Sequence, residues 1–86
     1  MSRESIVIVN GARTPVGRFQ GALASVPAHL LGAAAARAAL SRSGVRPEDI
    51  DEVVMGCIGQ VGADAYNARL VALAAGLPDR TPALTV

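Results

Sequence analysis

The 86-residue chain is long enough for one small domain or for part of a larger one. Its net charge is only +1, and its eight basic residues are arginines scattered along the sequence, so nucleic acid and anionic membrane are excluded as main partners. A single cysteine cannot form an internal disulfide, which indicates a reducing compartment, and we expect the cytoplasm. No apolar run approaches the ~20 residues that cross a membrane.

The hydrophobic residues are mostly small. They make up 51% of the chain, but there is one Phe, one Tyr and no Trp, and alanine, valine and leucine predominate. Such side chains each bury little area, and burial stabilises a fold by only about 25 cal/mol per Å². A chain of this length hides roughly 60–65% of the surface that it exposes when unfolded. We therefore expect an incomplete part of a larger domain rather than a self-sufficient core.

The first predicted element is a strand over residues 5–10. Residues 6–9 are an unbroken run of isoleucine and valine, too short for a buried helix. A strand without alternation is apolar on both faces, which is typical of parallel sheets that helices cover on each side.

A long loop is predicted from Gly11 to Ser25. Pro15 interrupts both strand and helix, and the loop carries Arg13 and Thr14. Loops of this length are usually functional or ordered against another part of the protein. Because ligands of open α/β sheets bind beyond the carboxyl ends of strands, this polar loop is a candidate edge of a site.

The longest predicted helix covers residues 27–43. Pro27 suits its first turn, Ser25 is the expected cap, and Gly44 is the expected left-handed terminator. Arg42 lies in the last turn, where the helix dipole favours a cation. The apolar stripe expected to face the core is Leu30, Leu31, Ala34, Ala35 and Ala38.

Three further elements follow. They are a strand over residues 52–58, a helix over residues 65–75 and the start of a strand over residues 82–86. The first two strands and the helix between them predict a βαβ unit, in which the loops after both strands emerge at the same end. The fold class is therefore α/β. The residues of the second helix expected to face inward are Leu70, Leu73 and Ala74.

Three stretches, in this order, resemble the amino-terminal part of the thiolases, the family of acetyl-CoA acetyltransferases and β-ketoacyl-CoA thiolases. They are residues 6–17 (IVIVNGARTPVG), 27–33 (PAHLLGA), and 67–69 (NAR) leading to 74–78 (AAGLP). The resemblance implies a thiolase fold, with two similar βαβαβαββ halves whose sheets sandwich shared helices. Residues 1–86 would be an incomplete amino-terminal part of the first thiolase domain, a βαβα(β) segment of a mixed sheet with helices on both faces.

The resemblance also implies a reaction, the reversible thiolytic cleavage or Claisen condensation of β-ketoacyl-CoA. In the family, a cysteine at a helix amino terminus attacks an acyl thioester, a histidine activates it, and a second cysteine removes a proton from acetyl-CoA. The nucleophilic cysteine follows shortly after the segment that resembles residues 81–86. We therefore expect no catalytic, cofactor-binding or metal-binding residue in this chain. Coenzyme A thioesters are the expected substrates of the whole enzyme, which needs no cofactor.

Two positions depart from the family pattern. Val26 stands where a polar cap often precedes the Pro-Ala-His run. Asn67 lies two rather than three residues before Arg69. Both departures affect where a helix begins.

Cys57 and His29 carry the side chains that could serve as nucleophile or base. A reactive thiol needs a helix start, a cation or a base beside it, and Cys57 in its predicted strand has none, so we expect a small buried hydrophobe. His29 falls in a first helical turn, where the dipole disfavours an imidazolium, so we expect a solvated or locally hydrogen-bonded side chain. One histidine and one cysteine so far apart do not have the spacing of metal ligands.

Arg13 admits two interpretations. It either orders its own loop by donating to carbonyl groups, or it braces the active-site end or a subunit contact, and Arg69 has the same ambiguity. Gly11, Gly17 and Gly21 invite a third interpretation, a phosphate-binding loop. Their spacing is not Gly-x-Gly-x-x-Gly and no helix follows directly, which argues against it.

The leading hypothesis is a segment of a thiolase-type acyl-CoA:acetyl-CoA C-acyltransferase of fatty acid metabolism, which forms a homo-oligomer, a dimer or a tetramer. The isolated chain is expected to be inactive. One alternative is a stand-alone, non-catalytic interaction module that docks a partner through its sheet edge. The other is a segment of a related condensing enzyme of the β-ketoacyl synthase or hydroxymethylglutaryl-CoA synthase type.

Overall fold

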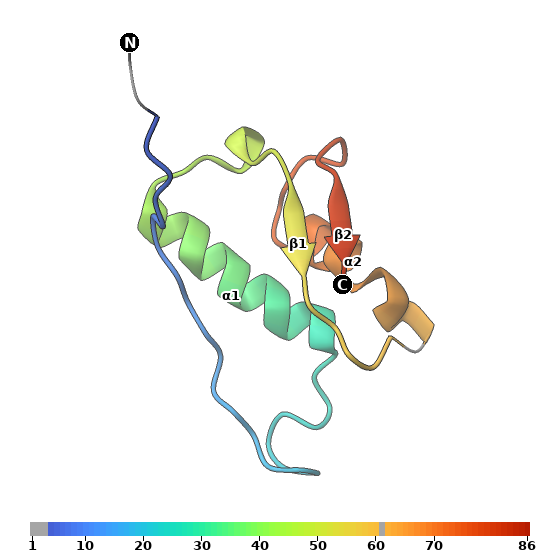
Figure 1. Ribbon diagram of the computed structural model, residues 1–86. Helices are drawn as coiled ribbons and strands as arrows, with labels where there is room; N and C mark the ends of the chain where they lie inside the picture. The colour runs from blue at the N-terminus through green and yellow to red at the C-terminus, as the bar shows by residue number, and fades with distance from the viewer. Residues whose placement is uncertain (1–3, 61) are drawn as a thin grey trace.

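The computed structural model, which describes residues 4–60 and 62–86, contains two helices and a two-stranded parallel sheet (Figure 1). This arrangement confirms the α/β class that the sequence predicts. The elements in chain order are α1 (Ala28–Ser43), the 3-10 turn η1 (Pro47–Asp49), β1 (Val53–Met55), the 3-10 turn η2 (Gly62–Tyr66), α2 (Asn67–Ala74) and β2 (Ala83–Thr85).

The sheet pairs β1 with β2 in parallel, with Val54 opposite Leu84. Helix α2 connects the two strands and packs against both, so the βαβ unit of the described residues is β1–α2–β2. Each strand is half-buried at its ends and exposed in the middle, because α2 covers one face only. Val54 and Leu84 remain 56% and 53% exposed on the other face.

Helix α1 begins without a side-chain cap. Pro27 precedes it in an extended conformation, and its carbonyl oxygen accepts hydrogen bonds from the amides of Leu30 at 3.0 Å and Leu31 at 3.3 Å. The expectation that Ser25 caps this helix is therefore wrong. The predicted end is confirmed, because Gly44 adopts a left-handed conformation with φ of 72° and its amide donates to the carbonyl of Leu40 at 3.1 Å.

The predicted core face of α1 is only partly right, because Leu31, Ala35 and Ala38 are half-buried but do not form the centre of the core. Leu30 and Ala34 are exposed, whereas Ala33 is buried and Ala36 and Leu40 pack against the same core. Apolar residues surround α1 on nearly every side, so their spacing does not single out one face.

The inward face expected for α2 is also only partly right: Ala74 packs against the core and Leu70 is half-buried, but Leu73 is exposed. Leu73 is 47% exposed, and the buried positions are Asn67, Ala68, Val71 and Ala72. This face of α2 packs against α1. The two helices approach closely there, because Gly32 of α1 has no side chain. A Cβ atom added to Gly32 would lie 2.9 Å from Cγ2 of Val71. Arg37 Nη1 also donates to the carbonyl of Ala74 at 2.7 Å, which ties α1 to the end of α2.

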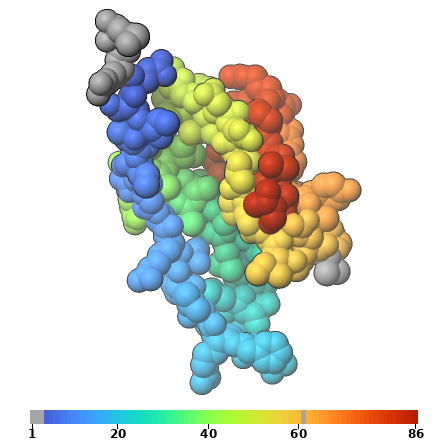
Figure 2. All heavy atoms as spheres, in the orientation of Figure 1, coloured from blue at the N-terminus to red at the C-terminus, as the bar shows by residue number. Residues whose placement is uncertain are grey.

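The strand predicted over residues 5–10 is not formed. These residues have no regular secondary structure, and the segment runs along the outside of the molecule, past α1 (Figures 1 and 2). All four residues of the apolar run 6–9 are exposed. A two-sided apolar strand requires a neighbouring strand and covered faces, and the described residues supply neither. A hydrogen bond from Arg42 Nη1 to the carbonyl of Gly11, at 3.3 Å, holds the segment beside α1.

Candidate functional site

The two strands end at the same edge of the sheet, as parallel strands must. Their pairing continues beyond β1 and β2, because the amide of Cys57 donates to the carbonyl of Val86 at 2.8 Å and the amide of Val86 donates to that of Met55 at 2.9 Å. In open α/β sheets, ligands bind beyond this carboxyl edge. The residues around the strand ends are therefore the candidate site.

The start of α2 lies at the same edge. The amide of Ala68 donates to Thr85 Oγ1 at 2.9 Å, so a residue of the last strand satisfies one of the free amides at the helix start. Asn67, one residue earlier, is only 5% exposed, and its Oδ1 has no hydrogen-bond partner among the described residues. Sequence reasoning missed both features, because a cap supplied from 17 positions away leaves no local pattern.

Cys57 lies at this edge through its backbone. Its side chain is half-buried, and no hydrogen bond to its sulfur occurs in the part of the chain that the structure describes. Its carbonyl accepts a hydrogen bond from Gln60 Nε2 at 2.9 Å. His29 is half-buried in the first turn of α1 and forms no hydrogen bond with another described side chain. Among the residues that the structure describes, no thiol is paired with a base.

Arg13 does not lie with the residues around the carboxyl edge. It is exposed, and with Thr14, Pro15 and Val16 it lines an open cavity of about 490 Å³ to which the loop after β1 contributes nothing. No hydrogen bond of Arg13 is found within residues 4–60 and 62–86. Arg69 behaves differently, because its Nη1 donates to the carbonyl of the buried Thr81 at 3.2 Å. Arg69 therefore fixes the turn that leads from α2 to β2.

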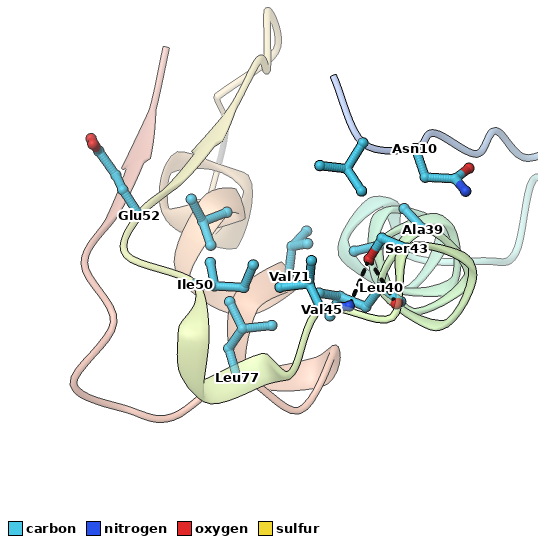
Figure 3. Close-up of a pocket in the computed structure, with 12 residues that line it drawn as sticks. Asn10, Ala39, Leu40, Ser43, Val45, Ile50, Glu52, Val71 and Leu77 are labelled. Atoms are coloured by element: carbon cyan, nitrogen blue, oxygen red, sulfur yellow. Dashed lines mark hydrogen bonds between the residues drawn. The ribbon is translucent and has the colours of Figure 1, made fainter. Parts of the chain in front are cut away.

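A second cavity, of about 340 Å³, opens between the amino-terminal segment, α1, β1 and α2 (Figure 3). Its few polar groups include Ser43, whose hydroxyl donates to the carbonyl of Leu40 at 2.9 Å and accepts from the amide of Val45 at 3.1 Å. The lining of this cavity is therefore mostly apolar, and the Ser43 hydroxyl is already hydrogen-bonded to the backbone. Its lining is Val9, Asn10, Ala36, Ala39, Leu40, Ser43, Val45, Ile50, Glu52, Val53, Val71 and Leu77.

Charged groups form one local cluster at the surface. Arg46 donates to both carboxylate oxygens of Asp49, at 2.9 Å and 3.0 Å, and this hydrogen bonding, with the nearby charge of Glu48, raises the pKa of the guanidinium. The cluster lies at η1, away from the carboxyl edge. Within the described residues, no three histidine, cysteine or acidic side chains gather as metal ligands would, and neither helix is long and apolar enough to cross a membrane.

Residues 6–86 match the family model for the thiolase amino-terminal domain. The chain is 49% identical over 81 residues to an acetyl-CoA acetyltransferase of Cupriavidus necator, a match that covers 94% of this chain and 21% of the relative. It is 41% identical over 85 residues to a mitochondrial acetyl-CoA acetyltransferase of Danio rerio, covering 99% of this chain and 20% of the relative.

The fold is similar to that of a solved structure, human mitochondrial 3-ketoacyl-CoA thiolase in complex with CoA. The TM-score is 0.84 at 43% sequence identity, and the match covers 91% of this chain and 20% of the human chain. The chain thus spans about a fifth of the length of the proteins that it matches.

Proposed function

Because the chain belongs to the thiolase family and matches its amino-terminal domain, we propose that it is the opening part of a thiolase-type acyl-CoA:acetyl-CoA C-acyltransferase. The whole enzyme would cleave β-ketoacyl-CoA with coenzyme A, or form it by Claisen condensation in the reverse direction. The observation that carries this proposal is the family match over residues 6–86, together with 49% identity to an acetyl-CoA acetyltransferase.

The described residues would contribute structure to this reaction. β1, α2 and β2 are held together at the carboxyl edge by the bond from Ala68 to Thr85 Oγ1 at 2.9 Å and by the pairing of Cys57 with Val86 at 2.8 Å. A rigid edge of this kind fixes the direction in which the chain leaves β2. Rigid elements hold a reacting group close to its productive geometry, which is where much of an enzyme's acceleration originates.

Acyl transfer to a thiol needs a cysteine activated by a base or by a helix start. Within the described residues the Cys57 sulfur has no hydrogen-bonded base, and the free amide of Ala68 at the start of α2 is satisfied by Thr85 Oγ1 rather than directed at the thiol. We therefore place the nucleophile in the part of the enzyme that residues 4–86 do not include. Coenzyme A thioesters are the proposed substrates, without a cofactor.

A thiolysis assay tests the proposal. Protein expressed from the complete coding region should consume acetoacetyl-CoA when coenzyme A is added, and the loss of the enolate absorbance measures the rate. Residues 1–86 expressed alone should show no turnover above buffer. A complete protein that leaves acetoacetyl-CoA intact, under conditions in which a known thiolase is active, would refute the proposal.

The proposal extends to the setting of the enzyme. We propose a role in fatty acid metabolism, a homo-oligomer (a dimer or a tetramer) and a cytoplasmic location. The relatives from Danio rerio and Xenopus tropicalis are mitochondrial proteins, so the location is a separate part of the proposal with its own test. Light scattering coupled to gel filtration measures the oligomeric state, and cell fractionation measures the location. A monomer, or a protein found in an organelle, would contradict the corresponding part.

A further inference from the structure

A buried side-chain oxygen without a partner marks the start of α2. Asn67 is 5% exposed, and its Oδ1 accepts no hydrogen bond within the described residues. Buried polar groups are nearly always paired, since leaving one unpaired costs the full free energy of removing it from water. Tyr66, the residue before α2, makes no side-chain hydrogen bond that caps the helix.

The position of Asn67 indicates where its partner comes from. Ala68, the next residue, donates its amide to Thr85 Oγ1 at 2.9 Å, so the start of α2 abuts the last residue of β2. Val86 follows directly and is fixed by the amide of Cys57 at 2.8 Å and the carbonyl of Met55 at 2.9 Å. An extended chain advances roughly 3.3–3.6 Å per residue, so the first few residues after Val86 are long enough to reach Asn67.

A parallel strand is normally followed by a loop and a helix, and the first amides of a helix have no partner within it. A buried amide oxygen at the edge of the strand is a suitable acceptor for such a group. We propose that Asn67 Oδ1 accepts a hydrogen bond from a backbone N–H of the segment that follows Val86, and that Asn67 is a positioning residue for that segment. This inference rests on the proposed function, which places that segment in the same polypeptide.

Hydrogen exchange on the complete protein tests the pairing directly, because the exchange rate of an amide reports its own hydrogen bond. Asn67→Leu removes the acceptor at similar size, whereas Asn67→Asp keeps an acceptor oxygen. Peptides that follow Val86 should contain one amide that exchanges roughly five- to tenfold faster in Asn67→Leu than in the wild type. Asn67→Asp should restore most of the protection, a rescue that a purely space-filling role would not show.

Asn10→Leu is the matched control, because Asn10 is exposed and its Oδ1 accepts only from the adjacent amide of Gly11 at 2.7 Å. It should leave exchange after Val86 unchanged. Asn67→Ala replaces the leucine variant if that variant does not fold. Wild-type exchange after Val86 in both apolar variants, or equal loss of protection in Asn67→Asp, would overturn the proposal.

The thiolysis assay on the wild-type protein separates this inference from the proposed function. Protection that depends on Asn67 in a protein without acyltransferase activity would keep the inference and refute the function. An active enzyme whose hydrogen exchange after Val86 does not change in the Asn67 variants would support the proposed function and refute this inference.

Discussion

Replacing Gly32 by alanine probes the closest approach between α1 and α2. The added Cβ atom would lie 2.9 Å from Cγ2 of Val71 and 3.3 Å from Cε of Met55, whereas carbon atoms pack best at about 3.5–4.0 Å. Met55 has a flexible side chain and can move. Val71 cannot do so easily, because it is branched at Cβ and only 1% exposed.

Two opposing terms set the magnitude. Gly→Ala inside a helix is intrinsically favourable by about 0.8–1 kcal/mol. Forcing a methyl group into a packed interface costs about 1–3 kcal/mol. We therefore expect Gly32→Ala to lower the free energy of unfolding by about 1 kcal/mol, with a range of about 0–2 kcal/mol.

The double variant gives the sharper test. Val71→Ala alone should lower the free energy of unfolding by about 2 kcal/mol, since it removes two buried methyl groups and leaves a cavity. It also removes the atom that Gly32→Ala would strike. In the Val71→Ala background, Gly32→Ala should therefore stabilise by about 1 kcal/mol, which is a reversal of sign.

Urea unfolding of the complete protein and its variants, followed by far-ultraviolet circular dichroism, measures these differences in the free energy of unfolding. Ala34→Gly on the exposed side of α1 measures the helix-propensity difference separately, and we expect it to lower the free energy of unfolding by about 1 kcal/mol. If Gly32→Ala stabilises the wild type as much as it stabilises the Val71→Ala variant, the two helices are not in the close contact described here.

Three further predictions follow from individual contacts. Thr85→Val keeps a β-branched strand residue but removes the acceptor for the amide of Ala68, so the free energy of unfolding should fall by about 1 kcal/mol, and an unchanged urea midpoint would argue against this cap. Arg37→Met removes the donor to the carbonyl of Ala74 and should cost about 0.5–1 kcal/mol in the same titration, whereas no change would mean that water replaces the bond without loss. Cys57→Ser in the complete protein should keep kcat for thiolysis within roughly twofold, whereas removal of a catalytic nucleophile lowers kcat by about 10⁶-fold in a serine protease.

The positions of the helices and of the last two strands, though not all of their lengths, could be predicted because local residues set them. Gly44 ends α1 through its left-handed conformation, and the predicted helix over residues 27–43 differs by one residue from α1 (Ala28–Ser43). The strands predicted over residues 52–58 and 82–86 contain β1 (Val53–Met55) and β2 (Ala83–Thr85). The predicted helix over residues 65–75 divides into η2 and the shorter α2.

Features that depend on distant parts of the chain could not be predicted in the same way. The apolar run 6–9 has the composition of a strand, but a strand exists only beside a partner, and β1 pairs with β2 alone in the described residues. The inner face of α1 could not be chosen among so many alanines. Thr85 and Asn67 matter at the candidate site because β2 returns to the start of α2, which no local spacing records.

The place at which the protein becomes acylated tests the account most directly. The complete protein is incubated with acetyl-CoA, quenched in acid and digested, and the modified peptide is identified by mass spectrometry. Acetyl transfer should label a cysteine that lies outside residues 4–86 and should be unaffected by Cys57→Ser. An acetyl group on Cys57, or a complete protein that takes up none, would contradict the proposal that these residues frame a site whose nucleophile follows them.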